Sequence, residues 1–155
     1  MPRPMSQGRV ACEKAVAYFL ENYNCAQSVL LAMFEHWNGK NELIPKIAPA
    51  FGGGIGRCGS ICGALTGGIM ALGTKFGTNE PSSEKRTDAY ELVQRFFRRF
   101  EKENGSVLCR ELVGYDLSDP RQLKEARGKD AFEEKCTVFI SKAVEALLEL
   151  TENRD

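Results

Sequence analysis

Apolar residues recur at intervals of three and four positions along most of this chain, and the apolar–polar alternation typical of β-strands is almost absent. This spacing predicts amphipathic α-helices joined by short connections. The predicted helices cover residues 9–21, 24–37, 42–50, 58–76, 83–104, 106–114, a turn or two from 119, and a last helix within 130–155. We therefore expect an all-α protein, a compact multi-helix bundle in a single domain of residues 1–155, with residues 1–8 disordered or tag-like.

Residues suited to helix ends support several of these boundaries. Asn24 is a possible N-cap of the second helix, and Gly105 is placed to close the long fifth helix. Asp119 followed by Pro120 suits a helix start, because aspartate is favoured at the N-cap and proline at the first helical position. Ser106 is the expected cap of the short helix that follows it. The third predicted helix contains two prolines and is the least regular.

The stretch GGGIGRCGSICGALTGGIMALG, residues 52–73, is unusually rich in glycine. We expect its first five residues to form a tight turn with positive φ angles, because glycine adopts that conformation without steric cost. Beyond the turn, Gly59, Gly63 and Gly67 recur every four residues, a spacing that lets another helix approach the backbone closely. The prediction is a buried, glycine-rich central helix.

The letters from Gly54 to Gly59 also match the G-x-G-x-x-G pattern of dinucleotide-binding loops. Those loops need a preceding strand and an acidic residue about 20 positions later within a βαβ unit, and the pattern here predicts no strand. The match is therefore weak, although glycine amides together with an arginine side chain could hold an anion. The candidate cofactor-binding residues are Gly54, Gly56, Arg57 and Gly59.

Length and charge disfavour membrane and nucleic-acid partners. The uncharged run from Cys58 to Thr74 is at the lower limit for crossing a bilayer and contains many small or weakly polar residues, so a buried helix explains it better. The 21 basic and 21 acidic residues balance, so no net field attracts nucleic acid or acidic lipid. The first helix lacks an uninterrupted apolar signal core, and we expect a cytoplasmic protein.

Six cysteines are the main chemical feature of the chain. In the cytoplasm they are expected to be thiols, metal ligands or redox groups rather than structural disulfides.

Cys58 and Cys62 lie four positions apart in the helix predicted over 58–76, so both side chains are expected on one face of it. They are the candidate catalytic residues. As a pair they could share a metal, act as a dithiol, or be small core residues, which is the default for buried cysteine.

Four stretches of the chain, in this order, carry a resemblance: NCAQSVL, FGGGIGRCGSICGALTGGIMALG, SVLCREL and KCTVFISKAVE. Together they resemble the redox-active family named for its cysteine signature, C_GCAxxG_C_C, over about residues 12–148. The C-G-A-x-x-G core of the signature is read here from Cys62 to Gly67. The redox activity of that family is itself inferred from its cysteines, so the resemblance defines the motif better than the chemistry.

The resemblance implies an all-helical protein with four recurring cysteines, which fall on Cys25, Cys62, Cys109 and Cys136. Cys12 matches none of the four, and the position of Cys58 is not fixed to cysteine in the family. Four thiols on four helices could meet in the core of a bundle, where they would form the ligand set of zinc or of an iron–sulfur cluster for electron transfer or sensing.

Two alternatives remain open at this level. One is a metal-free dithiol/disulfide redox protein, although the usual C-x-x-C is absent. The other is a structural or partner-binding helical protein with inert buried cysteines. His36, at a helix end, is expected to be a surface or packing residue, and no Ser/His or paired-carboxylate pattern favours a hydrolase. A redox partner protein is expected but not identified, and the aromatic face of helix 83–104 would suit either the core or a homodimer.

Overall fold

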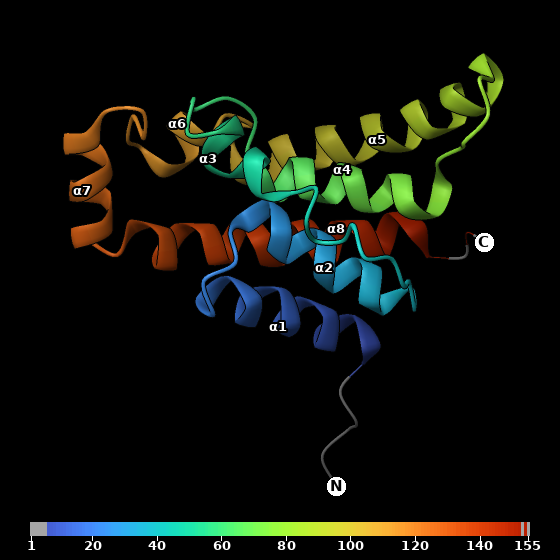
Figure 1. The fold of residues 1–155 in the computed structure, drawn as a ribbon, viewed down its shortest axis with the longest axis horizontal. Coiled ribbons are helices and arrows are strands. Elements are labelled where there is room, and N and C mark those ends of the chain that lie inside the picture. Colours follow the sequence, from blue (N-terminus) through green and yellow to red (C-terminus); the bar gives the residue numbers. More distant parts are fainter. Residues whose placement is uncertain (1–5, 153, 155) are drawn as a thin grey trace, which may run out of the picture.

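The computed structural model describes residues 6–152 and 154, which form helices joined by turns (Figure 1). Within these residues, β-structure is limited to one isolated bridge, between Ile61 and Leu108. No helix in this part of the chain has the length and apolar character needed to cross a bilayer. The all-α prediction is confirmed. The elements are α1 (Gln7–Leu20), α2 (Cys25–His36), the 3₁₀ turn η1 (Pro49–Phe51), α3 (Gly52–Ile55), α4 (Gly63–Phe76), α5 (Ser83–Asn104), α6 (Cys109–Val113), α7 (Pro120–Gly128), the π-helical turn η2 (Phe132–Cys136) and α8 (Thr137–Thr151).

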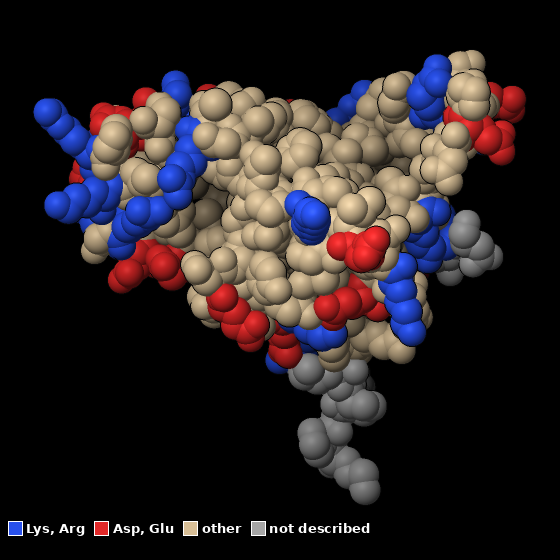
Figure 2. Space-filling model, in the orientation of Figure 1, with Lys and Arg blue, Asp and Glu red and all other residues tan. Residues whose placement is uncertain are grey.

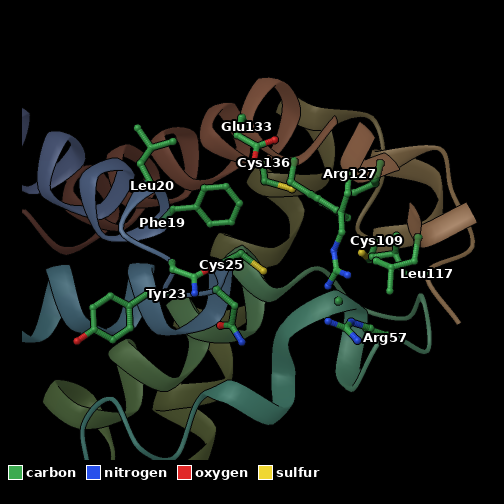
Figure 3. Close-up of a pocket in the computed structure, with 16 residues that line it drawn as sticks. Phe19, Leu20, Tyr23, Cys25, Arg57, Cys109, Leu117, Arg127, Glu133 and Cys136 are labelled. Atoms are coloured by element: carbon green, nitrogen blue, oxygen red, sulfur yellow. The ribbon is translucent and has the colours of Figure 1, made fainter. Parts of the chain in front are cut away.

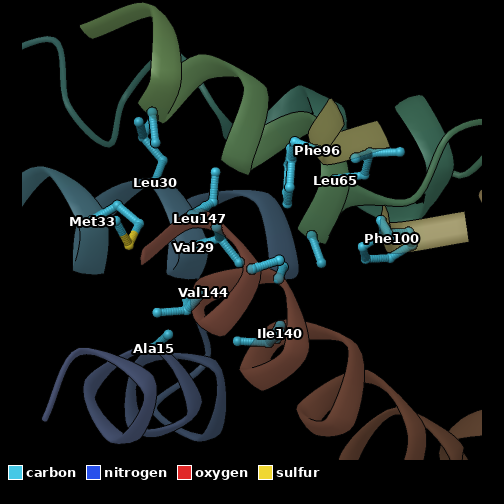
Figure 4. Packing of buried hydrophobic residues seen from close by; sticks show 14 of the residues in the cluster. Ala15, Val29, Leu30, Met33, Leu65, Phe96, Phe100, Ile140, Val144 and Leu147 are labelled. Atoms are coloured by element: carbon cyan, nitrogen blue, oxygen red, sulfur yellow. The ribbon is translucent and has the colours of Figure 1, made fainter. Parts of the chain in front are cut away.

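Five long helices enclose the main hydrophobic core. α8 contacts α1, α2, α4 and α5, and α2 also contacts α1 and α4. In the view of Figure 1, α1 lies below, α2 and α8 cross the middle, and α4 and α5 lie above. Figure 4 shows apolar side chains from these helices directed toward a shared interior; fully buried examples are Val29, Leu65, Phe96, Ile140 and Leu147.

Glycines let α2 and α4 approach each other closely. A Cβ added to Gly67 of α4 would collide with the main chain of Ala26 in α2 and would lie 2.9 Å from its Cα. A Cβ added to Gly63, at the start of α4, would overlap the sulfur of Cys25. Both glycines are buried. Their missing side chains therefore permit this helix contact and also bring Cys25 against the first turn of α4.

Several predicted helix ends are confirmed. Asn24 caps α2 and forms a reciprocal capping box with Gln27. Asp119 and Pro120 begin α7 as expected, because the aspartate side chain accepts a hydrogen bond from the second helical N–H. Gly105 ends α5 in the left-handed conformation, with φ +85°. The predicted bounds of α5 agree with the structure at both ends.

Three other predictions were wrong. Residues 42–50 form turns that lead into η1 instead of an α-helix. The helix expected from residue 58 begins only at Gly63, because the chain before it is extended and bridges to Leu108. Leu108, and not Ser106, occupies the N-cap of α6, and the Ser106 hydroxyl instead accepts a hydrogen bond from the Leu108 N–H at 3.0 Å.

The N-terminal segment that we expected to be disordered or tag-like, residues 1–8, is only partly described. Residues 1–5 lie outside the described residues. Ser6 caps α1 by accepting a hydrogen bond from the Arg9 N–H at 3.2 Å, and the helix begins at Gln7. α1 therefore starts two residues earlier than its apolar periodicity predicts.

Candidate functional site

A cavity of about 450 Å³ lies where α7 and η2 meet the ends of α1 and α2 (Figure 3). Figure 2 shows a hollow in this face of the molecule beside the basic residues over α7. We call this part of the molecule the cysteine end; it comprises the first turn of α2, α3, residues 56–62, α6, α7 and η2. The cavity is lined by Phe19, Leu20, Asn22, Tyr23, Asn24, Cys25, Gly53, Arg57, Cys109, Val113, Leu117, Leu123, Arg127, Phe132, Glu133 and Cys136.

Three of the four cysteines implied by the resemblance line this cavity. Cys25 is the first residue of α2, Cys109 is the first residue of α6, and Cys136 is the last residue of η2. Cys62 does not line the cavity, but it is buried next to these residues, at the N-cap position of α4. Its charge would interact with those of Cys25 and Cys109. The structure thus brings together four cysteines that are far apart in the sequence.

Main-chain pairing explains why Cys62 and Cys109 are neighbours. The Cys62 N–H donates to the Val107 carbonyl at 2.8 Å, and the Cys109 N–H donates to the Ser60 carbonyl at 2.7 Å. These bonds flank the isolated bridge and run antiparallel. They hold residues 60–62 extended, which ends any helix before Gly63 and fixes the first turn of α6 against the start of α4.

A second irregular element carries Cys136. Residues Phe132–Cys136 form a single turn of π-helix before α8 continues as a regular α-helix. Such turns are rare and frequently occur at functional sites. The additional residue in this turn rotates the preceding segment relative to α8. Cys136 and Phe132 consequently both line the cavity, while α8 keeps its own apolar face in the main core.

The third irregular element is a left-handed turn. Five consecutive residues, Gly53 to Arg57, have φ between +55° and +71°. The positive-φ turn predicted for residues 52–56 is confirmed from Gly53 to Gly56, but Gly52 has φ −67°. The extension of the turn to Arg57 is unexpected, because L-residues lose roughly 1–2 kcal/mol in this conformation.

Close packing fixes this turn against α6. A Cβ added to Gly54 would lie 2.6 Å from the Cβ of Cys109 and 2.7 Å from the main-chain nitrogen and oxygen of Ser60. Only glycine fits at this position, where both the φ angle and the available space exclude a side chain. The turn therefore supports the backbone that carries Cys109.

Burial is the main influence on the four thiols. It raises the pKa of Cys25 and Cys62, with opposing hydrogen bonds from the main-chain N–H groups of Gly53, Ala26 and Gly63 to Cys25. Burial and the nearby Cys25 raise the pKa of Cys109 to about 12. Burial and the other thiols also raise the pKa of Cys136. The reduced site therefore holds neutral thiols at pH 7, and a bound cation or an oxidant would be needed to remove their protons.

Cys58 and Cys12 lie outside this group. Cys58 is exposed in the turn before Ser60, whereas Cys62 is buried, so the prediction that they share one helix face was wrong. The cause is the extended segment that replaces the first turn of the predicted helix. Cys12 of α1 packs against α8, where its thiol donates a weak hydrogen bond to the Ser141 carbonyl at 3.8 Å.

The candidate cofactor-binding residues Gly54, Gly56, Arg57 and Gly59 all have positive φ angles. The N–H of Gly56 donates to the Ala50 carbonyl at 2.8 Å, and the N–H of Gly59 donates to the Gly53 carbonyl at 3.2 Å. These two amides are therefore engaged within the turn. Of the four candidates, Arg57 alone lines the cavity.

The sequence pattern does not predict most of the residues that line the cavity. Arg127 and Glu133 have no motif around them, and Phe19, Leu117 and Leu123 carry only an ordinary helical or turn pattern. Nothing local marks these residues, because they reach the cavity through packing between segments that are far apart in the chain. Among residues 6–152 and 154, no group of three or more His, Cys, Asp or Glu side chains is arranged to hold a metal ion.

Comparison with known proteins identifies the family to which this cysteine pattern belongs. Residues 23–150 match the model of the family described as "Putative redox-active protein (C_GCAxxG_C_C)". The chain belongs to this family. An uncharacterised protein of Archaeoglobus fulgidus is 30% identical over 154 aligned residues, which cover 93% of this chain and 95% of the relative. No solved structure matches the chain. The matched region includes the four converging cysteines of this C_GCAxxG_C_C protein and leaves out Cys12.

Proposed function

We propose that Cys25, Cys62, Cys109 and Cys136 form a redox centre that holds an iron–sulfur cluster for electron transfer or sensing. The observation that carries the proposal is the convergence of these four thiols from four separate segments. Three of them line one cavity, and Cys62 is buried close enough to interact with them. Membership of a family that is described as redox-active supports it. The left-handed turn that supports the backbone of Cys109 holds Ile55 and Arg57 in a strained conformation, and such strain clusters at functional sites.

Four cysteines are a ligand set for zinc as well as for a cluster, and the open space beside three of them is the argument for the cluster. Zinc binds four ligands at about 2.3 Å, which requires the sulfur atoms to surround one point. In the described residues no such group exists, and three of the thiols instead border an open space of about 450 Å³. A cluster distributes its thiolate ligands over several iron atoms, and when bound it would supply one-electron chemistry.

Main-chain N–H groups near Cys25 and Cys62 would stabilise thiolate ligands, and apolar side chains border the site. The main-chain N–H group of Gly53 in α3 approaches the Cys25 sulfur. The other N–H groups that approach the sulfurs of Cys25 and Cys62 lie at the first turns of α2 and α4, where helical N–H groups lack intrahelical partners. Such donors stabilise a negative sulfur and are one of the features that set cluster potentials. Phe19 and Phe132 add apolar walls that limit the access of water.

A metal-free dithiol centre is the second candidate. All six cysteines are free thiols in the structure, and the four converging ones, Cys25, Cys62, Cys109 and Cys136, are close enough to influence one another's ionisation. Two of these thiols could therefore form and break a disulfide. Cys58, which we predicted to act with Cys62, is the most accessible thiol for exchange with a partner protein.

Anaerobic purification, followed by iron, sulfide and zinc analysis, a visible spectrum and a free-thiol count, separates the two candidates. We expect iron and sulfide in the full chain, and their loss when any one of Cys25, Cys62, Cys109 or Cys136 is replaced by serine. Cys12→Ser and Cys58→Ser are the matched controls and should retain both. Retention of the cluster in the four test variants would contradict the proposal. Metal-free protein with a reversible disulfide among these four cysteines would establish the dithiol centre instead.

A further inference from the structure

Two arginines from distant segments line the cavity together with the cysteines. Arg57 ends the left-handed turn, and Arg127 lies in the last turn of α7. Figure 3 shows both side chains directed into the space between Cys25 and Cys109, with their guanidinium groups facing each other. Both residues are exposed, so they lie at the mouth of the cavity, whereas the thiols lie deeper.

The position of Arg57 depends on unusual backbone geometry. Arg57 has φ +66°, a conformation that a residue with a side chain adopts only at a cost of roughly 1–2 kcal/mol. Its stem lies across Gly53, where an added Cβ would come within 2.8 Å of the Arg57 Cγ. The turn therefore supplies both the direction of this side chain and the space for it. Backbone strain of this kind persists at sites that bind or react.

The charges of these two arginines are not neutralised by the protein. Neither forms an ion pair with another residue in 6–152 or 154, whereas Arg110, close by, pairs with Asp116 at 3.4 Å. Glu133 is the one acidic residue among those that line the cavity, and Figure 3 shows it beside Cys136, on the other side from the two guanidinium groups. Two like charges at one cavity mouth repel each other, and a bound anion would remove this repulsion.

We propose that Arg57 and Arg127 form a binding site for a small organic anion, such as a carboxylate with an apolar body. The carboxylate would lie between the guanidinium groups, which can each donate two parallel hydrogen bonds. The apolar body would lie against Leu117, Leu123 and Phe132 and extend toward the thiols. This proposal goes beyond the redox function and does not depend on it, because it requires only the cavity and the two arginines.

Equilibrium binding of benzoate tests the site, with benzamide as the neutral probe of the same shape. The readout is the side-chain Nε–Hε NMR signals of the arginines in the full-length, reduced protein at constant chloride. We expect saturable shifts of the Arg57 and Arg127 signals with benzoate, and binding at least tenfold weaker for benzamide. In the R57Q/R127Q variant, benzoate binding should weaken about tenfold, the size expected of two partly exposed charge contacts.

The R95Q/R98Q variant is the matched control, because it loses the same charge from an exposed face of α5 outside the cavity. Benzoate binding should be unchanged in it. The proposal is overturned if benzoate causes no saturable shift of Arg57 and Arg127, if benzamide binds equally well, or if both double variants weaken benzoate equally. R127Q alone, on the exposed side of α7, should weaken binding severalfold and serves if the double variant does not fold.

A second measurement tests the anion site through the rates at which the thiols react with an anionic and a neutral reagent. In the reduced, cluster-free C12S/C58S protein, the four remaining thiols react with either dithiobis(nitrobenzoate), a dianion, or dithiodipyridine, which is neutral. Each thiolate attacks the disulfide and releases one aromatic thiolate. The ratio of the two rates, anionic over neutral, should fall about tenfold in R57Q/R127Q and stay constant in R95Q/R98Q. Equal changes with both reagents would assign the arginines to the ionisation of the thiols and overturn the anion site.

Discussion

In the main core, α2 and α4 are in van der Waals contact through glycine, and the fully buried side chains of Leu30, Phe96 and Leu147 fill the interior. At the cysteine end, the same chain leaves a cavity of about 450 Å³ bordered by three thiols and two arginines. Both regions use glycine to bring backbones together. In the core, the close contact of two helices leaves no room for a side chain between them. At the cysteine end, the close contact fixes the left-handed turn beside an open cavity.

The backbones of the two regions differ in the same way. Three of the core helices, α1, α2 and α5, begin with side-chain caps, at Ser6, Asn24 and Ser82. The cysteine end contains a left-handed turn, a π-helical turn and an isolated bridge. Natural sequences satisfy local conformational preferences except where function requires otherwise. The concentration of exceptions around the four cysteines is therefore itself an argument that this end of the molecule is the functional one.

The largest expected effect tests how tightly the core is packed. Gly67→Ala should lower the free energy of unfolding by about 3 kcal/mol, because its Cβ would collide with the Ala26 main chain and neither helix can move without disturbing the core. Gly73→Ala, in the same helix, is the matched control. No atom lies within 4 Å of the added Cβ there, so helix propensity alone should raise stability by about 0.5–1 kcal/mol.

Urea denaturation of both variants provides the measurement, and the m-value shows whether each still unfolds as one unit. If Gly67→Ala proved as stable as the native protein, α2 and α4 would be free to separate. The main core would then be no more tightly packed than the cysteine end, and the contrast between the two regions would fail.

The sequence predicts the core far better than the cysteine end. The bounds of α5 follow from a single apolar stripe and from the glycine that ends it, both of which are local features. The start of α4 at Gly63 does not follow from local features. Residues 60–62 are held by hydrogen bonds to residues 107–109, and no pattern within the glycine stretch predicts that pairing. The resemblance to a family identified the four cysteines, but Arg127 and Glu133 reach the cavity only through tertiary packing.

The next effect concerns the buried thiols and depends on pH. The pKa of Cys109 is about 12 in the folded protein, and unfolded cysteine titrates near 8.5. Below about pH 8.5 both states keep the proton, so stability is unaffected. Above it the unfolded state loses the proton while the folded state retains it, so the free energy of unfolding falls as pH rises, by about 1.4 kcal/mol per pH unit for this thiol, up to pH 12.

Denaturation of the reduced, metal-free protein at several pH values between 8 and 10 measures this slope. Cys109→Ala should make the slope shallower by about 1.4 kcal/mol per pH unit, and the difference between the two proteins cancels the titration of groups that do not interact with Cys109. Identical slopes would mean that Cys109 ionises in the folded state as it does in the unfolded state. Water would then reach Cys109, in contradiction to the 6% exposure of this residue in the folded protein.

The smallest effect tests whether the left-handed turn is strained, and it compares two β-branched residues of equal exposure. Ile55 has φ +66° and is 43% exposed, whereas Val138 lies in regular α8 and is 44% exposed. Ile55→Gly should raise the free energy of unfolding by about 0.5 kcal/mol, because relief of the left-handed conformation exceeds the added flexibility of the unfolded chain. Val138→Gly should lower it by about 0.5–1 kcal/mol, since glycine weakens a helix interior. Urea midpoints at equal m-values give both numbers. Loss of stability in both variants would show that the turn carries no strain, and the irregular backbone at the cysteine end would then no longer argue for function.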